Sequence, residues 1–350
     1  MTATGGGRVL LCGYYGEHNL GDDALLQVLL QQLGPNTRPL ITAHDPAAVK
    51  AQAPMATCVD RRSLPRVLWA INSVDTVVFG GGSLLQDSTS FKSLVYYLAL
   101  IVVARLRGRR VLLWGQGLGP LRRPLSRWLV HALLPWCTAA SWRDQQSFDL
   151  AKRWAPSLPM AMAPDPVWQM PTSAWTGGES IVVSWRPTPL LTRARWINLV
   201  RALDQLSSEL EAPVVWLAFH HHQDADLLPW LDRDGILPSA LRRRSTVVVP
   251  QSLVAVDAAV QSARLVVPMR LHALILARLV GCPMAALSYD PKVAAAAAMS
   301  GVPCTDLTGW FSTEGLLAQW RGCVDRPADA DQLRSLQAQA SDHARLFSRG

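Results

Sequence analysis

The sequence predicts an α/β protein of two Rossmann-like domains that face a cleft. Short apolar segments rich in β-branched residues alternate with segments of helical period along the whole chain, as in parallel sheets covered by helices. The apolar segments are continuous, which is typical of strands buried on both faces. A length of 350 residues, 49% of them hydrophobic, fits two domains with a core each.

Nine apolar segments are expected to form strands. They are residues 8–12, 76–79, 111–114, 138–142, 181–185, 214–219, 246–249, 265–268 and 284–287. Between them the spacing of apolar residues predicts helices, for example over 22–33, 195–210 and 252–262. This alternating order favours an open, doubly wound sheet in each domain.

A domain boundary is expected near residues 170–180, where Pro, Gly and Ser are frequent and no periodicity is seen. We therefore predict an N-terminal domain over residues 1–172 and a C-terminal domain over 173–328. Residues 329–350 are polar and helix-prone, with leucines at 333, 336 and 346. This C-terminal helix either packs back on one domain or lies in solvent.

Composition excludes several classes of protein. Charged residues make up only 17% of the chain, which argues against a disordered protein. The six cysteines form no CxxC pair, so neither a disulfide scaffold nor a thiolate zinc site is expected. The start of the chain does not resemble a signal peptide, and the longest apolar run, 94–104, is shorter than the about 20 residues of a spanning helix. We expect a cytoplasmic protein, and contact with the inner face of the membrane stays open.

The net charge is +8, and almost all basic residues are arginines. This reflects either genomic base composition or an anionic partner, such as a phosphorylated small molecule, a membrane surface or a nucleic acid. Nucleic acid is not expected, because the basic clusters are short and scattered and no reading motif accompanies them.

Polar and glycine-rich segments follow the first strands of the N-terminal domain. In open α/β sheets ligands bind beyond the carboxyl ends of the strands. The first segment contains Gly16, Asn19, Asp22 and Asp23 before a helix. Its carboxylates serve either as a turn and N-cap or as ligands for substrate hydroxyls. His18 in the same segment contacts the ligand or faces solvent. The spacing is not GxGxxG, so no dinucleotide site is predicted.

Two further glycine-rich segments follow the next two predicted strands. One contains Gly81 and Gly82, the other Gly115 and Gly117. Three such strand ends in one domain are more than turns require. We expect them to form the floor of a cleft in which the backbone approaches a bulky polar ligand.

Several cations occupy strand-to-helix junctions. Arg143 ends a predicted strand, and Arg270 and His272 follow another. Lys292 comes after Asp290-Pro291, an N-cap with proline at the first helical position. A cation in a first helical turn opposes the helix dipole, whereas a helix N-terminus with an added cation binds dianions. Each cation therefore either binds a ligand anion, pairs with a local carboxylate or reaches solvent.

The histidines at 220–222 have two interpretations. On an extended strand end, His220, His222 and Asp224 would share a face and could hold a metal ion. Adjacent histidines are more often a solvated or ligand-facing edge. No metal site is predicted.

The ordered set of these motifs resembles the polysaccharide pyruvyl transferase family, most closely the CsaB-type bacterial enzymes. The likeness runs from about residue 8 to about residue 303. It rests on Asn19-Leu-Gly-Asp-Asp23, Gly80-Gly-Gly82, Gly115-Gln-Gly117, Arg143-Asp-Gln-Gln-Ser147, Arg270-Leu-His272 and Tyr289-Asp-Pro-Lys292. The histidines at 220–222 belong to no pattern of this family that we can identify.

The resemblance implies a GT-B-like fold and transfer of pyruvate from phosphoenolpyruvate (PEP) to two hydroxyls of a cell-wall or surface polysaccharide sugar, as a cyclic ketal. It implies a lipid-linked acceptor, and catalytic roles for Arg143, His272 and Lys292. His272 would be the general acid or base. Arg143 and Lys292 would bind the PEP anion, with Arg270 and Arg186 as further candidates.

On this interpretation the N-terminal domain is the acceptor side and the C-terminal domain the PEP side. No metal or cofactor is expected. Two other functions stay open. One is a nucleotide-sugar glycosyltransferase on the same fold, and the other is a non-catalytic protein that binds anions or glycolipids.

Overall fold

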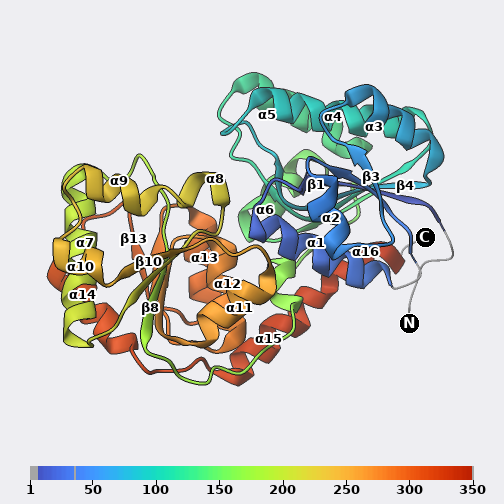
Figure 1. Ribbon diagram of the computed structural model, residues 1–350. Coiled ribbons are helices and arrows are strands. Elements are labelled where there is room, and N and C mark those ends of the chain that lie inside the picture. The colour runs from blue at the N-terminus through green and yellow to red at the C-terminus, as the bar shows by residue number, and fades with distance from the viewer. Residues whose placement is uncertain (1–6, 35–36, 349–350) are drawn as a thin grey trace. The chain divides into compact units, whose positions relative to one another are not determined.

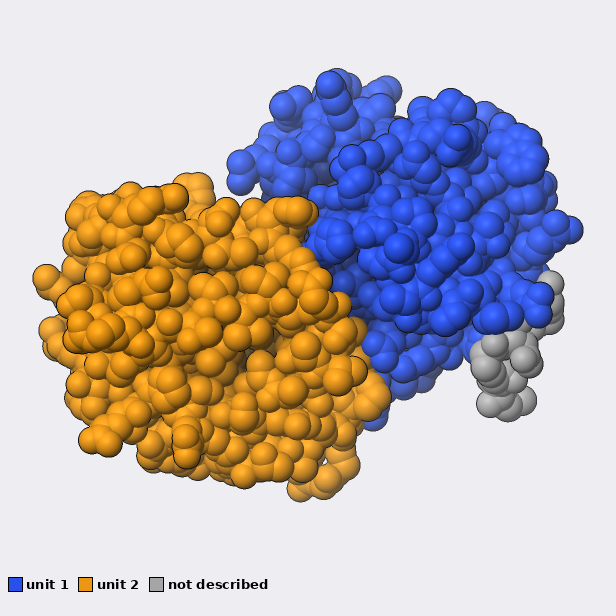
Figure 2. Space-filling view, viewed as in Figure 1, with its two compact units in different colours: residues 1–169, 338–350 blue, residues 170–337 orange. Residues whose placement is uncertain are grey.

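The computed structural model describes residues 7–34 and 37–348, and the chain forms two compact units (Figures 1 and 2). Unit 1 comprises Met1–Gln169 and Ala338–Gly350, and unit 2 comprises Met170–Gln337. The first six residues of the expected N-terminal domain and the last two of the expected C-terminal helix lie outside the described residues. Each unit is a Rossmann-like α/β domain, and each is described here by itself.

Unit 1 contains a seven-stranded sheet in the order β3-β2-β1-β4-β5-β6-β7, in which all pairs are parallel. The first six positions follow the order 3-2-1-4-5-6 of dinucleotide-binding folds. The strands are β1 Val9–Tyr15, β2 Leu40–Ala43, β3 Thr57–Asp60, β4 Thr76–Leu85, β5 Arg110–Leu118, β6 Ala139–Trp142 and β7 Met160–Met162. The helices of residues 20–169 are α1 Leu20–Leu33, α2 Pro46–Gln52, α3 Leu64–Ala70, α4 Phe91–Leu106, α5 Pro124–Leu133 and α6 Gln145–Trp154, with 3-10 turns η1 Ile71–Ser73, η2 Leu134–Trp136 and η3 Pro166–Gln169.

The helices of unit 1 pack on both faces of its sheet. α3, α4 and α5 lie side by side on one face (Figure 1), where Leu94 and Ile101 of α4 are fully buried in the same core as Phe79 and Leu113 of the strands. The central strands are apolar on both faces, as parallel strands covered by helices must be. Burial of these side chains is the main force that holds the sheet together.

Unit 2 has the same strand order. Its four-stranded sheet runs β10-β9-β8-β11, and β12 pairs with β13, all in parallel. A parallel bridge between Val266 and Met284 joins β11 to the segment before β12, so the order continues as 3-2-1-4-5-6. The strands are β8 Ser180–Ser184, β9 Val214–Leu217, β10 Ser245–Val248, β11 Ala263–Pro268, β12 Ala286–Ser288 and β13 Cys304–Asp306. The helices are α7 Arg193–Glu209, α8 His221–Asp224, α9 Leu227–Arg233, α10 Ser239–Arg243, α11 Leu253–Gln261, α12 Leu271–Val280, α13 Pro291–Met299 and α14 Thr313–Cys323.

A cluster of indole rings forms the core of unit 2. The ring of Trp185, just beyond β8, lies 6.2 Å from Trp196, 5.3 Å from Trp216 and 6.3 Å from Trp320 between centroids. Each of these rings is at most 4% exposed. The indole N–H of Trp185 donates to Val267 O at 2.9 Å. The cluster therefore fixes the end of β8, after which Arg186 leaves the sheet.

The structure confirms the nine strand positions predicted from the sequence and adds four strands, β2, β3, β7 and β13. Two predicted strands are longer than expected. β4 continues through Gly80–Gly82 to Leu85, and β5 through Gly115–Gly117 to Leu118. The glycines were expected after the strands, but pairing persists there, as between Gly82 and Gln116.

The C-terminal segment is helical, as expected, but over residues 330–348 it is divided by a 3-10 turn rather than continuous. The segment forms α15 Ala330–Ala340, the 3-10 turn η4 Ser341–Ala344 and α16 Arg345–Ser348. The turn at η4 brings His343 into the interior of unit 1, where its side chain is fully buried. The hydrogen bonds of that side chain to Ser141 and Pro164 hold the turn in place.

All six cysteines are free thiols in the structure. Of the helices in residues 7–34 and 37–348, none has both the length and the apolar character needed to cross a membrane.

Candidate functional site

The switch point of unit 1 lies between β1 and β4, and α1 begins beside it. Asn19 is the N-cap of α1 and accepts a hydrogen bond from Gly21 N at 3.2 Å. Its amide nitrogen also donates to the Asp22 carboxylate. Asp22 and Asp23 had been candidate caps, but both lie in the first turn of the helix. Because the cap is supplied by Asn19, the Asp22 carboxylate is available for another role.

The Asp22 carboxyl is poised to exchange a proton near neutral pH. Burial raises its pKa to about 7, and the neighbouring charge of Asp23 acts in the same direction. The charges of Arg143 and Arg61 and the hydrogen bond from Asn19 oppose this shift. Side chains with such pKa values are matched to general acid–base chemistry.

Four glycines of β4 and β5 were candidate site residues, and three of them have a packing reason. A Cβ atom on Gly81 would lie 2.7 Å from Leu25, one on Gly115 2.3 Å from Pro166, and one on Gly117 2.6 Å from Ser83 Oγ. Gly82 has a φ of +80°, and its Cβ would meet only Asp22 Oδ1 at 3.6 Å and Leu25 at 4.0 Å. Gly82 is therefore the one of the four that leaves room beside Asp22. Contact of these glycines with a ligand stays a prediction.

Gly16 also has a structural reason. Its φ is +72°, and a Cβ there would lie 2.7 Å from the backbone of Asp45. Only glycine adopts this conformation against a neighbouring chain without strain. His18, the other uncertain residue of this loop, has its Nε2 3.5 Å from Asp45 Oδ2.

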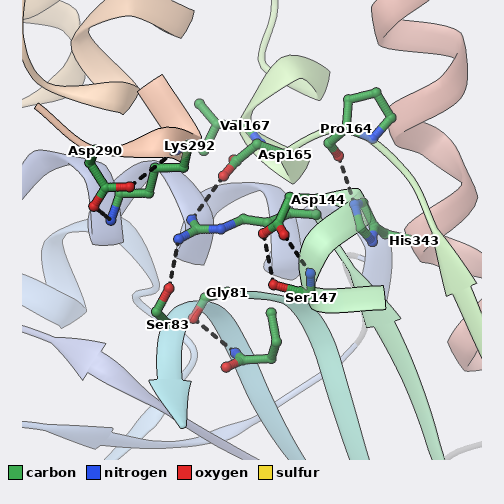
Figure 3. A network of polar contacts seen from close by, with 12 residues as sticks. Gly81, Ser83, Asp144, Ser147, Pro164, Asp165, Val167, Asp290, Lys292 and His343 are labelled. Carbon is green, nitrogen blue, oxygen red and sulfur yellow. Dashed lines mark hydrogen bonds and ion pairs between the residues drawn. The ribbon is translucent and has the colours of Figure 1, made fainter. Parts of the chain in front are cut away.

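Arg143 follows β6 as the sequence predicts, and Asp144 caps α6. The arginine is 6% exposed. Its Nη1 donates to Asp165 Oδ2 and its Nη2 to Ser83 Oγ, both at 3.0 Å (Figure 3). Its Nε is buried and has no hydrogen-bond partner in the described part of the chain. A buried guanidinium with a donor to spare is a natural partner for a ligand oxygen.

A buried histidine supports the loop that carries Asp165. His343 Nε2 lies 2.8 Å from Pro164 O, and His343 Nδ1 lies 2.8 Å from Ser141 Oγ (Figure 3). The carbonyl only accepts, so Nε2 is the protonated nitrogen and Ser141 donates to Nδ1. Burial lowers the pKa of His343, which keeps the ring neutral. The hydroxyl of Ser141 in turn accepts from Gly115 N at 2.9 Å.

Three of these residues were not predicted as part of the site. Ser83 directly follows the Gly80–Gly82 segment but was not singled out, whereas Asp165 and His343 are distant in sequence from the glycine and arginine motifs. Asp165 follows the short strand β7, which itself was missed. Only its position between two prolines, in Pro164-Asp165-Pro166, marks it in the sequence.

In unit 2 the switch point lies between β8 and β11, and an arginine follows each strand. Arg270 is the N-cap of α12, after β11. Its Nε donates to Asp224 Oδ2 at 3.1 Å, its Nη2 donates to the other Asp224 oxygen and, at 3.1 Å, to Gln223 Oε1. Asp224 has a side chain only 1% exposed, against 12% for Arg270. The aspartate of this pair is thus buried, whereas part of the arginine side chain is accessible.

The histidines at 220–222 do not form the extended edge considered above. His220 caps α8, His221–Asp224 are helical, and Asp224 Oδ2 accepts from His220 N at 2.9 Å. The chain turns here because Asp224 bonds both to this backbone N–H and to Arg270. Burial and the charge of Arg270 lower the pKa of His220 to about 4. Among the described residues no three His, Cys, Asp or Glu side chains are placed to hold a metal ion.

The segment after β12 follows the prediction closely. Asp290 caps α13 and accepts from Lys292 N at 3.1 Å, and Pro291 is the first helical residue. The ammonium of Lys292 lies 3.4 Å from Asp290 Oδ2 (Figure 3). Both side chains are about one third exposed. The lysine thus opposes the helix dipole but gains a local carboxylate.

Arg186, at the end of β8, contacts the residue before this cap. Its Nη1 donates to Tyr289 Oη at 3.3 Å, and its guanidinium lies 5.1 Å from the centre of the Tyr289 ring. His272 is the second residue of α12 and is partly buried. The structure therefore places Arg186, Arg270, His272 and Lys292 at the carboxyl end of the unit 2 sheet. Asp22, Gly82 and Arg143 lie at the carboxyl end of the unit 1 sheet.

A surface hollow of about 430 Å³ lies elsewhere in unit 2. It is lined by the start of β10 and by α9 and α10, including Arg233, Arg242 and Thr246. This is the amino end of the sheet, where ligands of open α/β sheets do not bind. We do not assign it to the site.

The fold belongs to the GT-B class of two Rossmann-like units, as similar solved structures show. The UDP-GlcNAc 2-epimerase of Methanocaldococcus jannaschii matches with a TM-score of 0.65, 11% identity and coverage of 98% of this chain and 99% of its own. HepE of Anabaena, in complex with UDP and glucose, matches with a TM-score of 0.62, 12% identity and coverage of 98% and 97%. MurG of Acinetobacter baumannii matches with a TM-score of 0.50, 14% identity and coverage of 98% of this chain and 100% of its own.

The sequence itself identifies the family. Residues 19–291 match the polysaccharide pyruvyl transferase family, and the chain belongs to it. The match begins at the Asn19 cap of α1 and ends at Pro291, at the start of α13. No curated protein matches the chain significantly.

Proposed function

We propose that the protein transfers pyruvate from PEP to two hydroxyls of one sugar of a cell-wall or surface polysaccharide, as a cyclic ketal. The observation that carries the proposal is the set of cations at the carboxyl end of the unit 2 sheet, in a chain of the pyruvyl transferase family. PEP has a phosphate and a carboxylate close together. Its binding therefore calls for several cations and helix N-termini within one small region.

The proposed reaction opens the C=C double bond of PEP and breaks its bridging C–O bond, and it forms one C–H bond at the methylene carbon and two C–O bonds at C2. A proton adds to the methylene carbon, and the C2 carbon becomes an electrophilic, cation-like centre. One sugar hydroxyl attacks C2, and its proton is removed. The second hydroxyl then displaces phosphate from C2, so that the C–O bond of PEP breaks. The two hydroxyl protons balance the proton added to carbon and the one taken by the leaving phosphate.

Unit 2 would bind the donor. Lys292 and Arg270 are each paired with a carboxylate, but the pairs differ. Lys292 is about one third exposed and lies in the first turn of α13, and a helix N-terminus favours an anion. Arg270 is held by Asp224 through Nε and Nη2, which leaves Nη1 for the anion. Arg186 is the further arginine of this set.

His272 would exchange the proton with the carbon or the hydroxyl. It lies two residues after Arg270, in the first turn of α12. Histidine is the side chain that most often serves as a general acid or base in enzymes. In this proposal the arginines and the lysine supply the positive charge, so no metal ion or cofactor takes part in the reaction.

Unit 1 would bind the sugar through Asp22 and Asp23, with Gly82 leaving space beside the first carboxyl. Asp22 can accept a hydrogen bond from a hydroxyl and, with its raised pKa, a proton as well. The resemblance assigns Arg143 to the PEP anion too, and its unpartnered Nε supports a ligand contact. A lipid-linked acceptor, as in CsaB-type enzymes, is part of the proposal.

The first test compares donors. The protein is titrated by calorimetry and heated with PEP, UDP-glucose, UDP-GlcNAc and inorganic phosphate. We expect PEP to bind and to raise the melting temperature more than phosphate does, and phosphate release to require both PEP and a sugar acceptor. Activity should survive a chelator.

Other outcomes would contradict the proposal in distinct ways. Protection by a UDP-sugar alone would favour a glycosyltransferase. Binding of PEP without phosphate release for any acceptor would favour a non-catalytic anion-binding protein. Loss of activity with a chelator, restored by one divalent ion, would show that a metal ion takes part.

A further inference from the structure

One face of unit 1 has an unusual charge. It consists of α3 with η1 and its flanks (residues 61–74), α4 with its flanks (88–110) and α5 with η2 (119–138), which we call the helix layer. These segments contain eleven Lys and Arg and no Asp or Glu. The rest of the chain has 23 basic and 26 acidic residues and is therefore slightly negative. The net charge of +8 is positive only because of the helix layer. Base composition explains abundant arginine, but it does not explain a layer without acids.

The same face exposes large apolar side chains. Among the described residues, fourteen large hydrophobic side chains are exposed, and seven of them lie in the helix layer. They are Leu64, Trp69, Val95, Leu106, Leu125, Trp128 and Trp136. Trp69 is 72% exposed, Leu106 73% and Trp128 64%. Exposed indoles and leucines in such number on one face mark an interaction surface.

α5 shows the exposure of apolar side chains most clearly. Its inward side buries Ser126 and Val130, as any surface helix does. Its outward side should then be polar, yet it carries Leu125 and Trp128 beside Arg127. A helix that is apolar on both sides has a second apolar partner.

The three helices form one surface, and the layer itself supplies no carboxylate to its cations. From outside the layer, Glu17 pairs with Arg61 at 2.6 Å, and Asp87 accepts from the backbone N–H groups of Arg122 and Arg123. An Arg107 nitrogen donates to Leu68 O and so joins the end of α4 to α3, next to Trp69. The guanidinium of Arg123 lies 5.1 Å from the ring of Phe91 and joins α5 to α4. These contacts, like that of Arg109 with Asn72 O, use carbonyls and rings rather than carboxylates. Figure 1 shows the helices in a row on one face of the sheet.

We propose that the helix layer docks on the surface of an anionic phospholipid bilayer. Indole rings settle at the level of the lipid headgroups, and leucines reach the start of the acyl chains. Arginines and lysines near such a surface are attracted by the negative headgroups. The combination of aliphatic side chains, tryptophans and a net positive charge fits this partner. A nucleic acid would leave Leu106 and Leu125 without a role, and a second copy of this face would be repelled by its charge.

The test is co-sedimentation of the full chain with vesicles. Vesicles of phosphatidylcholine with about one third phosphatidylglycerol should bind the protein, and pure phosphatidylcholine should bind it far less. Added salt should weaken the binding. Trp69→Ser with Trp128→Ser should weaken it at least tenfold. Arg122→Gln with Arg123→Gln should weaken it by about fivefold for each charge removed.

Matched controls make the test specific. Trp310→Ser removes a tryptophan of unit 2 that is 88% exposed, and Arg242→Gln with Arg243→Gln removes an adjacent arginine pair of unit 2. These variants should bind vesicles like the wild type. All variants should keep the wild-type melting temperature and PEP binding, since none of these residues belongs to the candidate site.

Four results would overturn the proposal. They are equal binding to neutral and anionic vesicles, no binding to either, equal loss in the controls, or tighter binding to duplex DNA or RNA than to vesicles. Self-association of the wild type that Trp128→Ser abolishes would instead assign the face to a second copy of the chain. The proposal does not depend on the donor of the reaction, so it can fail while pyruvyl transfer holds.

Discussion

Asp22 combines a charge that is costly to bury with a position that suits catalysis. The carboxyl lies beside Gly82 and is held by Asn19, and its pKa is raised to about 7. Between the unfolded value of about 4 and this value, the folded state binds more protons than the unfolded state. The contribution of Asp22 to stability is therefore greatest at low pH and is lost as the pH rises through about 7.

Asp22→Asn should reveal this cost. The amide carries no charge, so the melting temperature of the variant, compared with the wild type, should rise as the pH is raised from about 4 to about 8. In the same variant the KM for the sugar acceptor should increase more than the Kd for PEP. Thermal scans across this pH range and a titration with each substrate provide the measurements. If the difference in melting temperature between variant and wild type stays constant with pH, the pKa of Asp22 is not raised in the folded protein. If the variant loses affinity for PEP alone, unit 1 binds the donor and unit 2 the acceptor.

Lys292 tests the donor side. Lys292→Ala removes a charge-assisted contact, so the Kd for PEP should rise about ten- to a hundredfold. The pair with Asp290, whose side chains are about one third exposed, contributes little to stability, and the cap hydrogen bond from the backbone N–H of residue 292 to Asp290 remains. The melting temperature should therefore change by no more than a degree or two. Lys292→Arg should restore binding only in part, because a planar guanidinium does not replace a compact ammonium.

Lys50→Ala is the matched control, since Lys50 lies in the last turn of α2 in unit 1 and outside the site. It should leave PEP binding unchanged. Normal PEP binding by Lys292→Ala, together with a lower melting temperature, would make Lys292 a structural residue.

At the scale of elements, the strand ends decide where the functional side chains lie. The Trp185 cluster fixes the end of β8, and the side-chain amide of Gln116 joins β4 to β5 by donating to Gly81 O at 2.9 Å. The C-terminal segment likewise fixes strand ends in unit 1. η4 inserts His343 between Ser141, at the end of β6, and Pro164, next to Asp165.

His343→Ala should destabilise the protein by roughly 2–4 kcal/mol, because it leaves a cavity and two buried polar groups without partners. His343→Gln, which keeps a donor and an acceptor, should cost less. Urea unfolding followed by circular dichroism gives both values, with exposed His131→Ala as the control. A change below about 0.5 kcal/mol for His343→Ala would show that the C-terminal segment does not hold the Asp165 loop.

Particular elements show what the sequence could predict. The cap at Asp290-Pro291 and the arginines after β6 and β11 were predictable, because a single local pattern specifies each. β2, β3, β7 and β13 were missed, since they have three or four residues each and three of them lie at sheet edges. β3, with the sequence Thr-Cys-Val-Asp, buries no residue fully, so it has no apolar run to detect. The carboxylate partners Asp165 and Asp224 depend on tertiary contacts, which no spacing in the sequence encodes.

At the scale of the whole molecule, the two units repeat one plan. Each has its first and fourth strands adjacent, and each places polar residues beyond the carboxyl ends of these strands. The cations of unit 2 are the main support for the proposal of a phosphorylated donor. The raised pKa of Asp22 in unit 1 is the main support for the proposal that this unit binds an acceptor hydroxyl. The family match, over residues 19–291, includes Asp22, Arg186 and Arg270 and ends one residue before Lys292.

The most direct test of pyruvyl transfer follows the oxygen that joins carbon and phosphorus in PEP. PEP labelled with ¹⁸O at this bridging position is incubated with the protein and a sugar acceptor, and both products are examined by mass spectrometry. Ketal formation breaks the C–O bond, so the account predicts that the label leaves with the phosphate and that the sugar gains the mass of one pyruvic acid less one water. Phosphate without the label, or a sugar of unchanged mass, would contradict it.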